Sequence, residues 1–323
     1  MKPKIAFIGL SGCGGCEAAL LDLGAELTEL AARADIVYWP LALDYKKERL
    51  ENLAEGELEA VWINGTVRTA EQEDRVRLVR RKARRVIAQG TCAHLGGIAG
   101  LANLFRKEEL LAAVFQTGLL VNNPAGIRPG DRTTGGESPP LPPLKNRVQP
   151  LNRIIPVDAV IPGCPPPPAL SLRAFSALLD GTLPLQGAVL AAEKALCAYC
   201  PRKDSRPERF KWRRPARVHQ KIWDPAICFL AAEIPCLGPA TRGDCGSRCL
   251  QANMPCRGCF GPVEKAGDQG ARIIAFLASL LEPAAGEDVE ALMKTIPDPT
   301  GLAYLYSLAA CPLFPEAPEE DDG

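Results

Sequence analysis

The cysteines are the feature of this sequence that most limits its possible structures. Twelve of the 13 cysteines fall into three sets of four, and eight of them lie in a glycine- and proline-rich stretch between Cys197 and Cys259. Such sets either pair as disulfides or bind metal. The chain begins MKPKIAFIGL, which has neither the apolar core nor the cleavage site of a secretory signal. The sequence therefore predicts reduced thiols held by metal, because disulfide networks need an oxidising compartment.

The kind of metal is predicted from the number of sets and from the scarcity of histidine. Zinc accepts four cysteines, and a single C-x-x-C pair such as Cys197 and Cys200 would indicate zinc. This chain has three sets and only two histidines, His94 and His219. Four-cysteine sets without histidine are typical of iron-sulfur clusters. Clusters are therefore favoured, with a zinc-stabilised scaffold or assembly protein as the alternative.

Length and charge limit the class of protein. A chain of 323 residues with 47% hydrophobic content can bury a substantial core as one large or two modest domains. It has 38 basic and 38 acidic residues, so it has no general affinity for nucleic acid. No apolar run approaches the roughly 18 residues of a membrane span. We expect a cytoplasmic protein with no membrane span.

Short apolar strands alternate with helices in the N-terminal half. The expected strands are Lys4–Gly9, Ile36–Trp39, Ala60–Ile63, Arg85–Ala88 and Asp158–Ile161, and the expected helices are Ala18–Leu30, Glu71–Arg84 and Ala169–Leu179. This order predicts an α/β domain over residues 1–186, with a doubly wound parallel sheet of the flavodoxin-like type. Sheets of this type bind ligands beyond the carboxyl ends of their strands.

The first four cysteines fall at such strand ends. Cys13 and Cys16 follow the first expected strand, Cys92 follows the fourth, and Cys164 follows the fifth. We expect these four thiols, the first set, to meet at one edge of the sheet. The alternative is that Cys92 and Cys164 are small buried core residues. The stretch Asn122–Leu151, rich in proline and glycine, is expected to be a surface or partner-contacting loop, or only a linker.

Residues 187–323 are predicted to form an irregular, cysteine-rich domain. Few periodic apolar residues remain there, so metal binding is expected to supply much of the folding free energy. Chain order groups the other eight cysteines into a second set, Cys197, Cys200, Cys228 and Cys236, and a third set, Cys245, Cys249, Cys256 and Cys259. Ferredoxins with two clusters exchange a ligand between their motifs, so another partition stays open.

Other features of this half carry weaker predictions. Gly267–Leu281 and Val289–Met293 are expected to be helices, Cys311 a buried structural cysteine, and Glu316–Asp322 a disordered tail. The stretch Arg202–Lys221 holds nine lysines and arginines. We interpret it as a docking surface for an acidic redox partner or as solvated surface, in preference to a nucleic-acid site.

Four motifs together resemble the small subunit of nickel-iron hydrogenases, and in particular the cytoplasmic class whose electrons go to heterodisulfide reductase or to dyes such as methyl viologen. The motifs are SGCGGCE, GTCAHLGGIAGLANL, IPGCPPPPAL, and CLGPATRGDCGSRC followed by PCRGCFGP. The resemblance runs from residue 4 to about residue 263. It implies an oxidoreductase subunit that relays electrons and has no catalytic residue of its own, because hydrogen is split in a separate large subunit.

The resemblance also implies three 4Fe-4S clusters. The proximal cluster, facing the nickel-iron site, would be held by Cys13, Cys16, Cys92 and Cys164; the medial cluster by Cys245, Cys249, Cys256 and Cys259; and the distal cluster by Cys197, Cys200, Cys228 and Cys236. A further redox subunit, such as a heterodisulfide reductase or a ferredoxin-like protein, would exchange electrons with the distal cluster. No nucleic acid is expected as a partner.

Departures from the periplasmic members of the family support this version of the resemblance. Those members have a twin-arginine signal, a histidine as first distal ligand and a 3Fe-4S medial cluster on three cysteines. This chain has no such signal, has Cys197 at the histidine position, and has Cys249 as a fourth cysteine near the medial set. The related cluster-bearing subunit of respiratory complex I typically uses adjacent cysteines for one cluster, which this chain lacks, and it stays the alternative oxidoreductase.

Polar groups near the expected clusters complete the predictions. Backbone amides of Gly12–Gly15 and Gly258–Gly261 are expected to donate hydrogen bonds to cluster sulfurs. Glu17 is expected to make polar contacts or move protons at the subunit junction, or to be an ordinary carboxylate at a helix N-terminus. His94 is expected to pack or hydrogen-bond near the proximal cluster and not to be a ligand.

Overall fold

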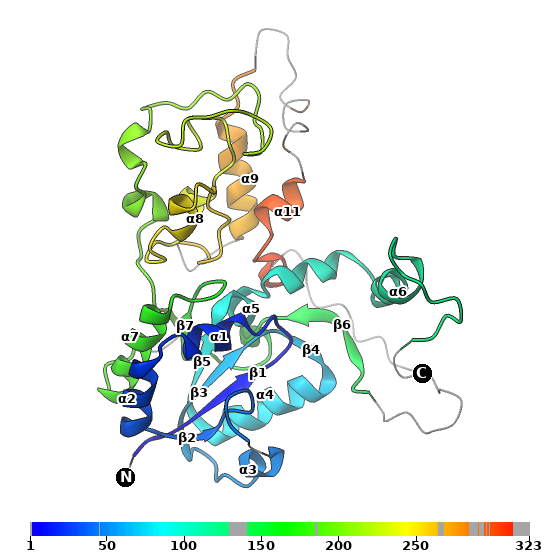
Figure 1. The fold of residues 1–323 in the computed structure, drawn as a ribbon, viewed down its shortest axis with the longest axis vertical. Coiled ribbons are helices and arrows are strands. Elements are labelled where there is room, and N and C mark those ends of the chain that lie inside the picture. Colours follow the sequence, from blue (N-terminus) through cyan, green and yellow to red (C-terminus); the bar gives the residue numbers. More distant parts are fainter. Residues whose placement is uncertain are drawn as a thin grey trace.

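The computed structural model describes residues 2–44, 46–128, 141–184, 187–263, 268–283, 290, 294, 296 and 298–312 (Figure 1). The expected helix Val289–Met293 lies outside these residues except at Glu290, and the expected tail Glu316–Asp322 lies outside them entirely. None of the helices in the described ranges has the length and apolarity that crossing a bilayer needs.

A six-stranded parallel sheet forms the N-terminal part of the structure. Its strands are β1 (Lys4–Gly9), β2 (Asp35–Tyr38), β3 (Leu58–Asn64), β5 (Ala83–Gln89), β7 (Ala159–Ile161) and β8 (Ala188–Val189). Their order is β2-β1-β3-β5-β7-β8, and every neighbouring pair is parallel. This is the flavodoxin-like order with one added edge strand, and the predicted α/β fold is confirmed. The two-residue strand β8 was too short to be predicted.

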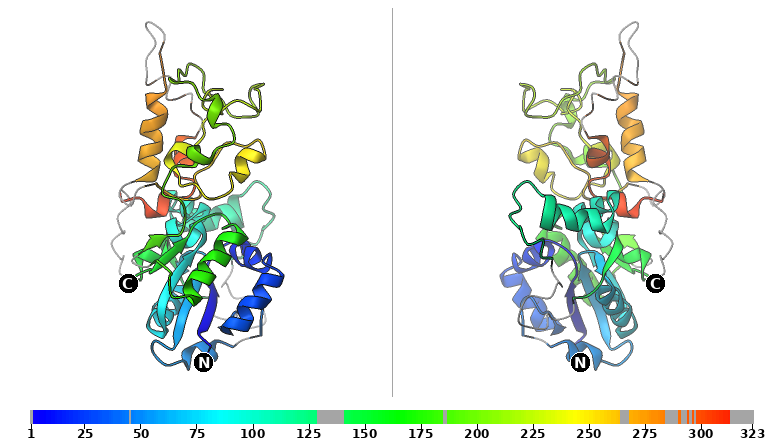
Figure 2. Two further views of the ribbon diagram at one scale, coloured as in Figure 1. Left: turned by 90° about the vertical axis from the view of Figure 1, so that its left-hand side faces the viewer. Right: turned by 90° about the vertical axis from the view of Figure 1, so that its right-hand side faces the viewer.

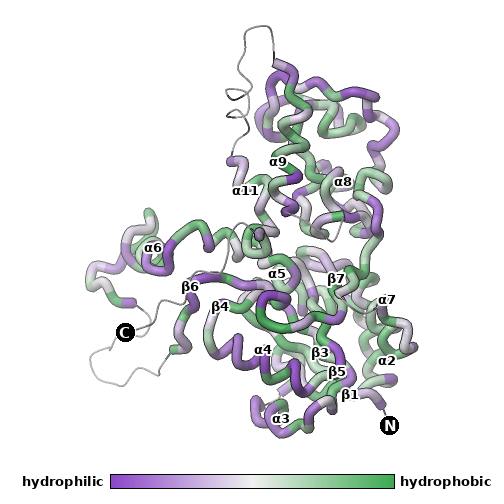
Figure 3. Tube along the Cα trace, turned by 180° about the vertical axis from the view of Figure 1, so that it is seen from behind, coloured by the Kyte–Doolittle hydropathy of each residue, from purple (hydrophilic) through white to green (hydrophobic). Residues whose placement is uncertain are grey.

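Helices cover both faces of this sheet. The helices on one face are α1 (Gly15–Leu21), α2 (Ala25–Arg33) and α7 (Pro168–Leu179), and those on the other are α3 (Lys47–Glu51) and α4 (Ala70–Lys82). Side chains alternate along each strand, so Phe7 and Trp62 join the first core and Ile8 and Val61 the second. Figure 3 shows β3 and β5 in hydrophobic colours, whereas the solvent-facing helix α4 is largely hydrophilic. Burial on both faces explains why the strands read as apolar runs.

The single helix expected over Ala18–Leu30 is wrong. The structure has two helices there, α1 and α2, separated at Gly24, which has φ of 57° and ψ of −117°. No helix can pass through such a backbone conformation, and only glycine adopts it without strain. The apolar spacing continued across the break because both helices pack on the same face of the sheet.

The expectation of a loop throughout Asn122–Leu151 is also wrong in part. Strand β6 (Leu144–Gln149) pairs antiparallel with β4 (Val67–Thr69) in a separate two-stranded sheet, and the short helix η3 (Leu151–Arg153) follows. Residues 129–140 lie outside the described residues. The strand LKNRVQ escaped prediction because Val148 is the one fully buried residue in it.

A helical excursion follows the fourth expected strand and precedes β6 of this two-stranded sheet. It consists of α5 (Gly90–Leu95), η1 (Ile98–Leu104), α6 (Lys107–Ala112) and the π-helix η2 (Ala113–Thr117). In Figure 1 the region of α6 projects sideways from the sheet. Only α5, at the root of the excursion, lies directly at the carboxyl end of β5.

The cysteine-rich part lies beyond one edge of the sheet (Figure 2). Its elements are short: η4 (Leu196–Tyr199), η5 (Lys203–Ser205), η6 (Gly238–Ala240), α8 (Arg248–Gln251), α9 (Gln269–Ser279), α11 (Pro299–Ala303) and η7 (Leu308–Ala310). The expected helix Gly267–Leu281 corresponds to α9. Most of the chain before α9 is irregular, as expected.

This part nevertheless has an apolar core, although few periodic apolar residues indicated one. Trp212 and Phe229 are almost completely buried and pack with Ile273 and Leu277 of α9. Three thiols, those of Cys228, Cys236 and Cys256, belong to the same core. The core was missed because its residues recur with neither helical nor strand spacing. Apolar burial and metal binding must therefore share the stabilisation of this region.

The end of the described chain returns to the sheet. Gly97 of the α5–η1 turn donates a backbone hydrogen bond to the carbonyl of Tyr306 (3.1 Å). Cys311 is buried, as expected, and its thiol donates to the carboxylate of Asp268 at the start of α9 (2.7 Å). The division into domains at residue 186 stays a prediction, and β8 at residues 188–189 still belongs to the sheet.

Candidate iron-sulfur centres

The structure brings the four thiols of the first set together. They line one cavity at the carboxyl edge of the sheet, with Gly12, Asn64, Thr91 and Pro165 among its other walls. The thiols come from α1 and the loop before it, from α5, and from the loop after β7. Because β1, β5 and β7 are parallel, their following segments converge at this edge.

Hydrogen bonds fix the loop that carries Cys13. The backbones of Ser11 and Thr66 exchange two hydrogen bonds (3.1 and 2.7 Å), which fasten the loop to the segment after β3. The side chain of Ser11 contacts that of Gln72 (3.0 Å), which also forms a capping box with Thr69 at the start of α4. The loop is therefore held from two directions before any metal binds.

Two glycines make room for sulfur. A Cβ on Gly90, which has φ of 84°, would lie 2.3 Å from Cys16 Sγ. A Cβ on Gly97 would lie 2.5 Å from Cys92 Sγ. Both distances are far inside van der Waals contact, so the sulfurs pack against bare backbone. This cradle suits a group that needs its thiols close to the chain, as iron-sulfur clusters do.

Ionisation of the first set's thiols is unfavourable when no cation is bound to them. Burial, with a smaller contribution from the neighbouring thiols of the set, raises the pKa of Cys16 to about 12 and that of Cys92 to about 11. A thiolate is the form that binds metal, and a bound cation supplies the compensating positive charge. The donor set therefore fits a metal cluster better than four free thiols.

The second set also lines a single cavity. Cys197 and Cys200 come from η4, and Cys228 and Cys236 from the irregular chain that follows. Burial raises the pKa of Cys236 to about 12 and that of Cys197 to about 11. Gly238 packs against this set, since a Cβ there would lie 3.3 Å from Cys197 Sγ.

The thiols of the third set lie close enough together to raise one another's pKa. Burial, with a smaller contribution from the thiols of Cys245 and Cys249, raises the pKa of Cys259 to about 12. Burial likewise raises the pKa of Cys256, with contributions from Cys236, Cys259 and Cys245. Cys249 is the exposed member and Cys256 the most buried. The second set thus shares one cavity, and the partition of the eight cysteines between two clusters stays a prediction.

The third set lies between the other two. On one side, Thr91 Oγ1, next to Cys92 of the first set, donates to the Cys259 carbonyl (2.7 Å). On the other side, the backbone N–H of Cys256 donates to Cys236 Sγ (3.3 Å). The spatial order is therefore first set, third set, second set.

Several expected polar contacts have definite places. Gly258 N donates to Cys256 Sγ (3.4 Å), as expected for that turn. Glu17 is buried and accepts a hydrogen bond from Trp39 Nε1 (3.2 Å), and burial raises its pKa. His94 is half-buried beside Gly261, and removal of its ring from water lowers its pKa to about 4, so it is neutral. Its ring packs against the turn after Cys259 and does not line the cavity of the first set.

Sequence reasoning missed two arginines at the second set. Arg202 and Arg206 line its cavity, although the basic stretch that contains them was interpreted as surface. The position of Arg202, two residues after the C-x-x-C pair, was the available signal.

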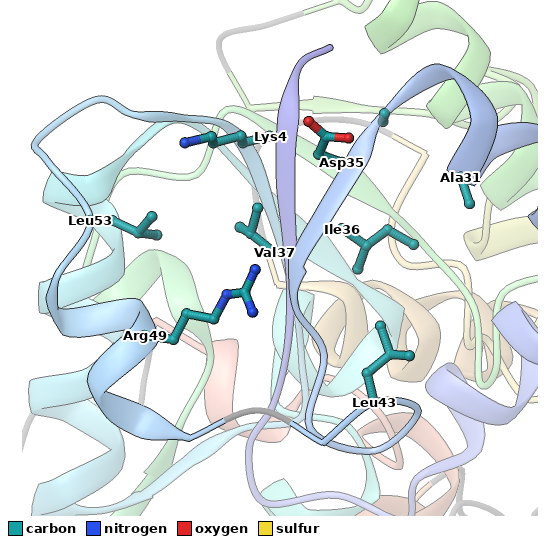
Figure 4. Close-up of a pocket in the computed structure, with 9 residues that line it drawn as sticks. Lys4, Ala31, Asp35, Ile36, Val37, Leu43, Arg49 and Leu53 are labelled. Atoms are coloured by element: carbon teal, nitrogen blue, oxygen red, sulfur yellow. The ribbon is translucent and has the colours of Figure 1, made fainter. Parts of the chain in front are cut away.

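The structure has a larger cavity of about 550 Å³ at the edge strand β2 (Figure 4). It is lined by Lys4, Ala31, Ala34, Asp35, Ile36, Val37, Leu43, Arg49 and Leu53. Lys4 and Asp35 begin their strands, so the cavity lies toward the end of the sheet opposite the thiols. It offers no cysteine or histidine. Within the described ranges, no three Cys, His, Asp or Glu side chains are placed to hold a single metal ion.

Comparisons with known proteins define the class. The family described as NADH ubiquinone oxidoreductase, 20 Kd subunit, matches residues 13–178. A subunit of the F420-non-reducing vhu hydrogenase of Methanocaldococcus jannaschii is 39% identical over 91% of this chain and 95% of its own length. The iron-sulfur subunit of the F420-non-reducing hydrogenase of Archaeoglobus profundus is 35% identical over 95% of this chain and 97% of its own. The chain belongs to this oxidoreductase family and, within it, to the hydrogenase small subunits of the F420-non-reducing class.

A solved structure supports the fold. The [NiFeSe] hydrogenase from Desulfovibrio Vulgaris Hildenborough, in the oxidized state, matches with a TM-score of 0.52 and 19% identity, over 81% of this chain and 94% of that chain. The protein is an oxidoreductase subunit, and its role in the complex is electron transfer, as the four motifs implied.

Proposed function

We propose that this chain is the electron-relay subunit of a cytoplasmic nickel-iron hydrogenase and that it holds three 4Fe-4S clusters. The observation that carries the proposal is the spatial order of the cysteines. In the third set, the Cys259 carbonyl accepts a hydrogen bond from Thr91, which adjoins Cys92 of the first set, and the backbone N–H of Cys256 donates to Cys236 Sγ of the second. Three four-thiol sets in contact form a continuous path through the protein.

The proposed ligands follow from this order. The first set, at the sheet, would hold the proximal cluster; Cys245, Cys249, Cys256 and Cys259 the medial cluster; and Cys197, Cys200, Cys228 and Cys236 the distal cluster. Residues 1–186 would form the domain that holds the proximal cluster. Residues 187–323 would form the domain that holds the other two clusters.

The chain's own residues would hold the clusters and control their surroundings. Each bound cluster would accept and release one electron at a time. Burial of Cys228, Cys236 and Cys256 excludes water from the path. Backbone N–H groups donate to sulfur at Cys200 (from Arg202, 3.4 Å) and at Cys256 (from Gly258, 3.4 Å). Such bonds stabilise negative charge on sulfur.

Exposure at the two ends of the path supports two partners. Cys13 and Cys164 of the first set are exposed, so that end is open to a large subunit with the nickel-iron site. At the other end, next to the second set, the basic stretch Arg202–Lys221 is mostly exposed, and so are Tyr199 and Ile222. This end would meet a further redox subunit, such as a heterodisulfide reductase or a ferredoxin-like protein.

The test is anaerobic iron, sulfide and zinc analysis with low-temperature EPR of the reduced complex. About twelve irons and twelve sulfides per chain, with coupled signals of reduced clusters, are expected. Stoichiometric zinc without sulfide would contradict the relay and leave a metal-stabilised scaffold.

Replacing Cys13 with alanine should abolish hydrogen-dependent viologen reduction, because the electron path loses its proximal cluster. Iron should fall by about four per chain while the clusters of the second and third sets stay assembled. The matched control is Cys311→Ala, which removes a buried thiol outside the three sets and should keep all the iron. Unchanged viologen reduction in Cys13→Ala would exclude the first set as the proximal site.

A further inference from the structure

Arg202 is a buried charge beside the second set. The residue is 6% exposed and lines the same cavity as the four thiols. Arginine is almost never buried to this extent unless it is paired. Its Nη2 donates to Asn253 Oδ1 (2.7 Å), but its Nη1 is buried without a hydrogen-bond partner in the described structure.

Aromatic rings hold this guanidinium in place. Its central carbon lies 4.2 Å from the ring centre of Phe229 and 5.3 Å from that of Trp223. Contacts of this kind with a ring face favour a cation. Ion pairs among the described residues do not include Arg202, so no carboxylate there neutralises it. An uncompensated buried charge is costly, which indicates that an anion belongs in this cavity.

A second arginine reaches the same sulfurs. Arg206 also lines the cavity, and its positive charge favours the thiolate form of Cys197. It is exposed, unlike Arg202. Its effect on charge inside the cavity is therefore screened more strongly by water.

Positive charge increases along the path from the first set to the second. The residues that line the cavity of the first set include no lysine or arginine, and its charged neighbour is Glu17. At the third set, Arg257 lies near the Cys249 thiol. At the second set, two arginines line the cavity. Uptake of one electron adds one negative charge with no proton, so a nearby fixed cation favours the reduced form.

We propose that Arg202, supported by Arg206, makes the cluster held by the second set the most easily reduced of the three clusters. Electron transfer from the first set toward the second is thereby favoured. The inference rests on the proposed function, since it needs a cluster on these four thiols. It makes Arg202 a tuning residue, which touches no substrate.

The experiment is a redox titration of the whole complex followed by EPR. In Arg202→Met, which keeps the aliphatic contact with the rings and removes the charge, the midpoint potential of one cluster should move to a more negative value. Arg202→Lys should restore most of the difference, and Arg206→Met should give a smaller shift in the same direction. The control is Arg209→Met, which makes the same change in net charge at an exposed position of the same stretch and should leave all potentials unchanged.

The outcomes separate the inference from the function on which it rests. If the cluster of the second set is retained in Arg202→Met with an unchanged potential, the inference is overturned. If Arg202→Met loses that cluster, the inference is tested with Arg206→Met. A more negative midpoint potential of the cluster in Arg206→Met supports the inference, and an unchanged midpoint potential overturns it. Cys228→Ala identifies the signal. If no cluster is lost in that variant, the ligand assignment itself fails.

Discussion

Replacing Gly90 with alanine is expected to prevent assembly of the first cysteine set. The new methyl group would lie 2.3 Å from Cys16 Sγ and 3.5 Å from the Gly163 carbonyl oxygen. Neither neighbour can retreat, because both belong to segments that carry ligands of the set. The left-handed backbone at Gly90 adds a cost of about 1–3 kcal/mol for a residue with a side chain. Iron should fall by about four per chain, and hydrogen-dependent viologen reduction should be lost.

The chain offers a matched control for the backbone effect. Gly181 has φ of 71°, and a Cβ there would meet no atom within 4 Å. Gly181→Ala should therefore cost the same about 1–3 kcal/mol of stability as the backbone strain at Gly90 and keep all the iron. Iron analysis and thermal unfolding of both variants make the comparison. A Gly90→Ala protein with its full iron content would show that the cradle around Cys16 is not required.

Replacing Trp212 with alanine should have the largest effect on folding. The side chain is completely buried at the centre of the cysteine-rich core, and its Nε1 donates to the Leu230 carbonyl (2.7 Å). Loss of a buried tryptophan typically costs about 3–5 kcal/mol, which is a large part of the roughly 5–15 kcal/mol that stabilises a domain. We expect the second and third sets to lose iron while the sheet stays folded.

Hydrogen exchange resolved along the chain measures this difference between regions. Protection should disappear in the residues around η4, η6 and α9 and persist in β1, β3 and β5. Trp212→Phe is the control, since it keeps an aromatic ring and removes the hydrogen bond. This change should lower the stability by about 1–3 kcal/mol. Full protection of the cysteine-rich part in Trp212→Ala would mean that metal binding alone maintains its structure.

The sequence was most informative where local rules apply. Parallel strands buried on both faces read as apolar runs, and their topology requires that the segments after β1, β5 and β7 meet. For that reason the amino-acid sequence alone was enough to place Cys13, Cys92 and Cys164 at one edge of the sheet. The break at Gly24 was missed because an apolar face continues through it. The strand β6 was missed because it is only half buried.

Irregular regions were less accessible to prediction. The core around Trp212 and Phe229 has no period, so its residues could not be distinguished from loop residues. Burial of Arg202 depends on two aromatic rings more than twenty residues further along the chain. Chain order alone would place the second set next to the first. Only the family resemblance indicated that the third set comes between them, and the hydrogen bonds of Cys256 and Cys259 agree with that order.

The return of the chain end to the sheet has a consequence for biosynthesis. The turn after α5, which packs against Cys92, is bonded to the carbonyl of Tyr306, and Gly96 and Gly100 pack against Ala309. These contacts join segments about two hundred residues apart, so they form late, after nearly all of the described chain has left the ribosome. A chain that ended before Tyr306 would lack these contacts, so the turn that packs against Cys92 would not be held in place.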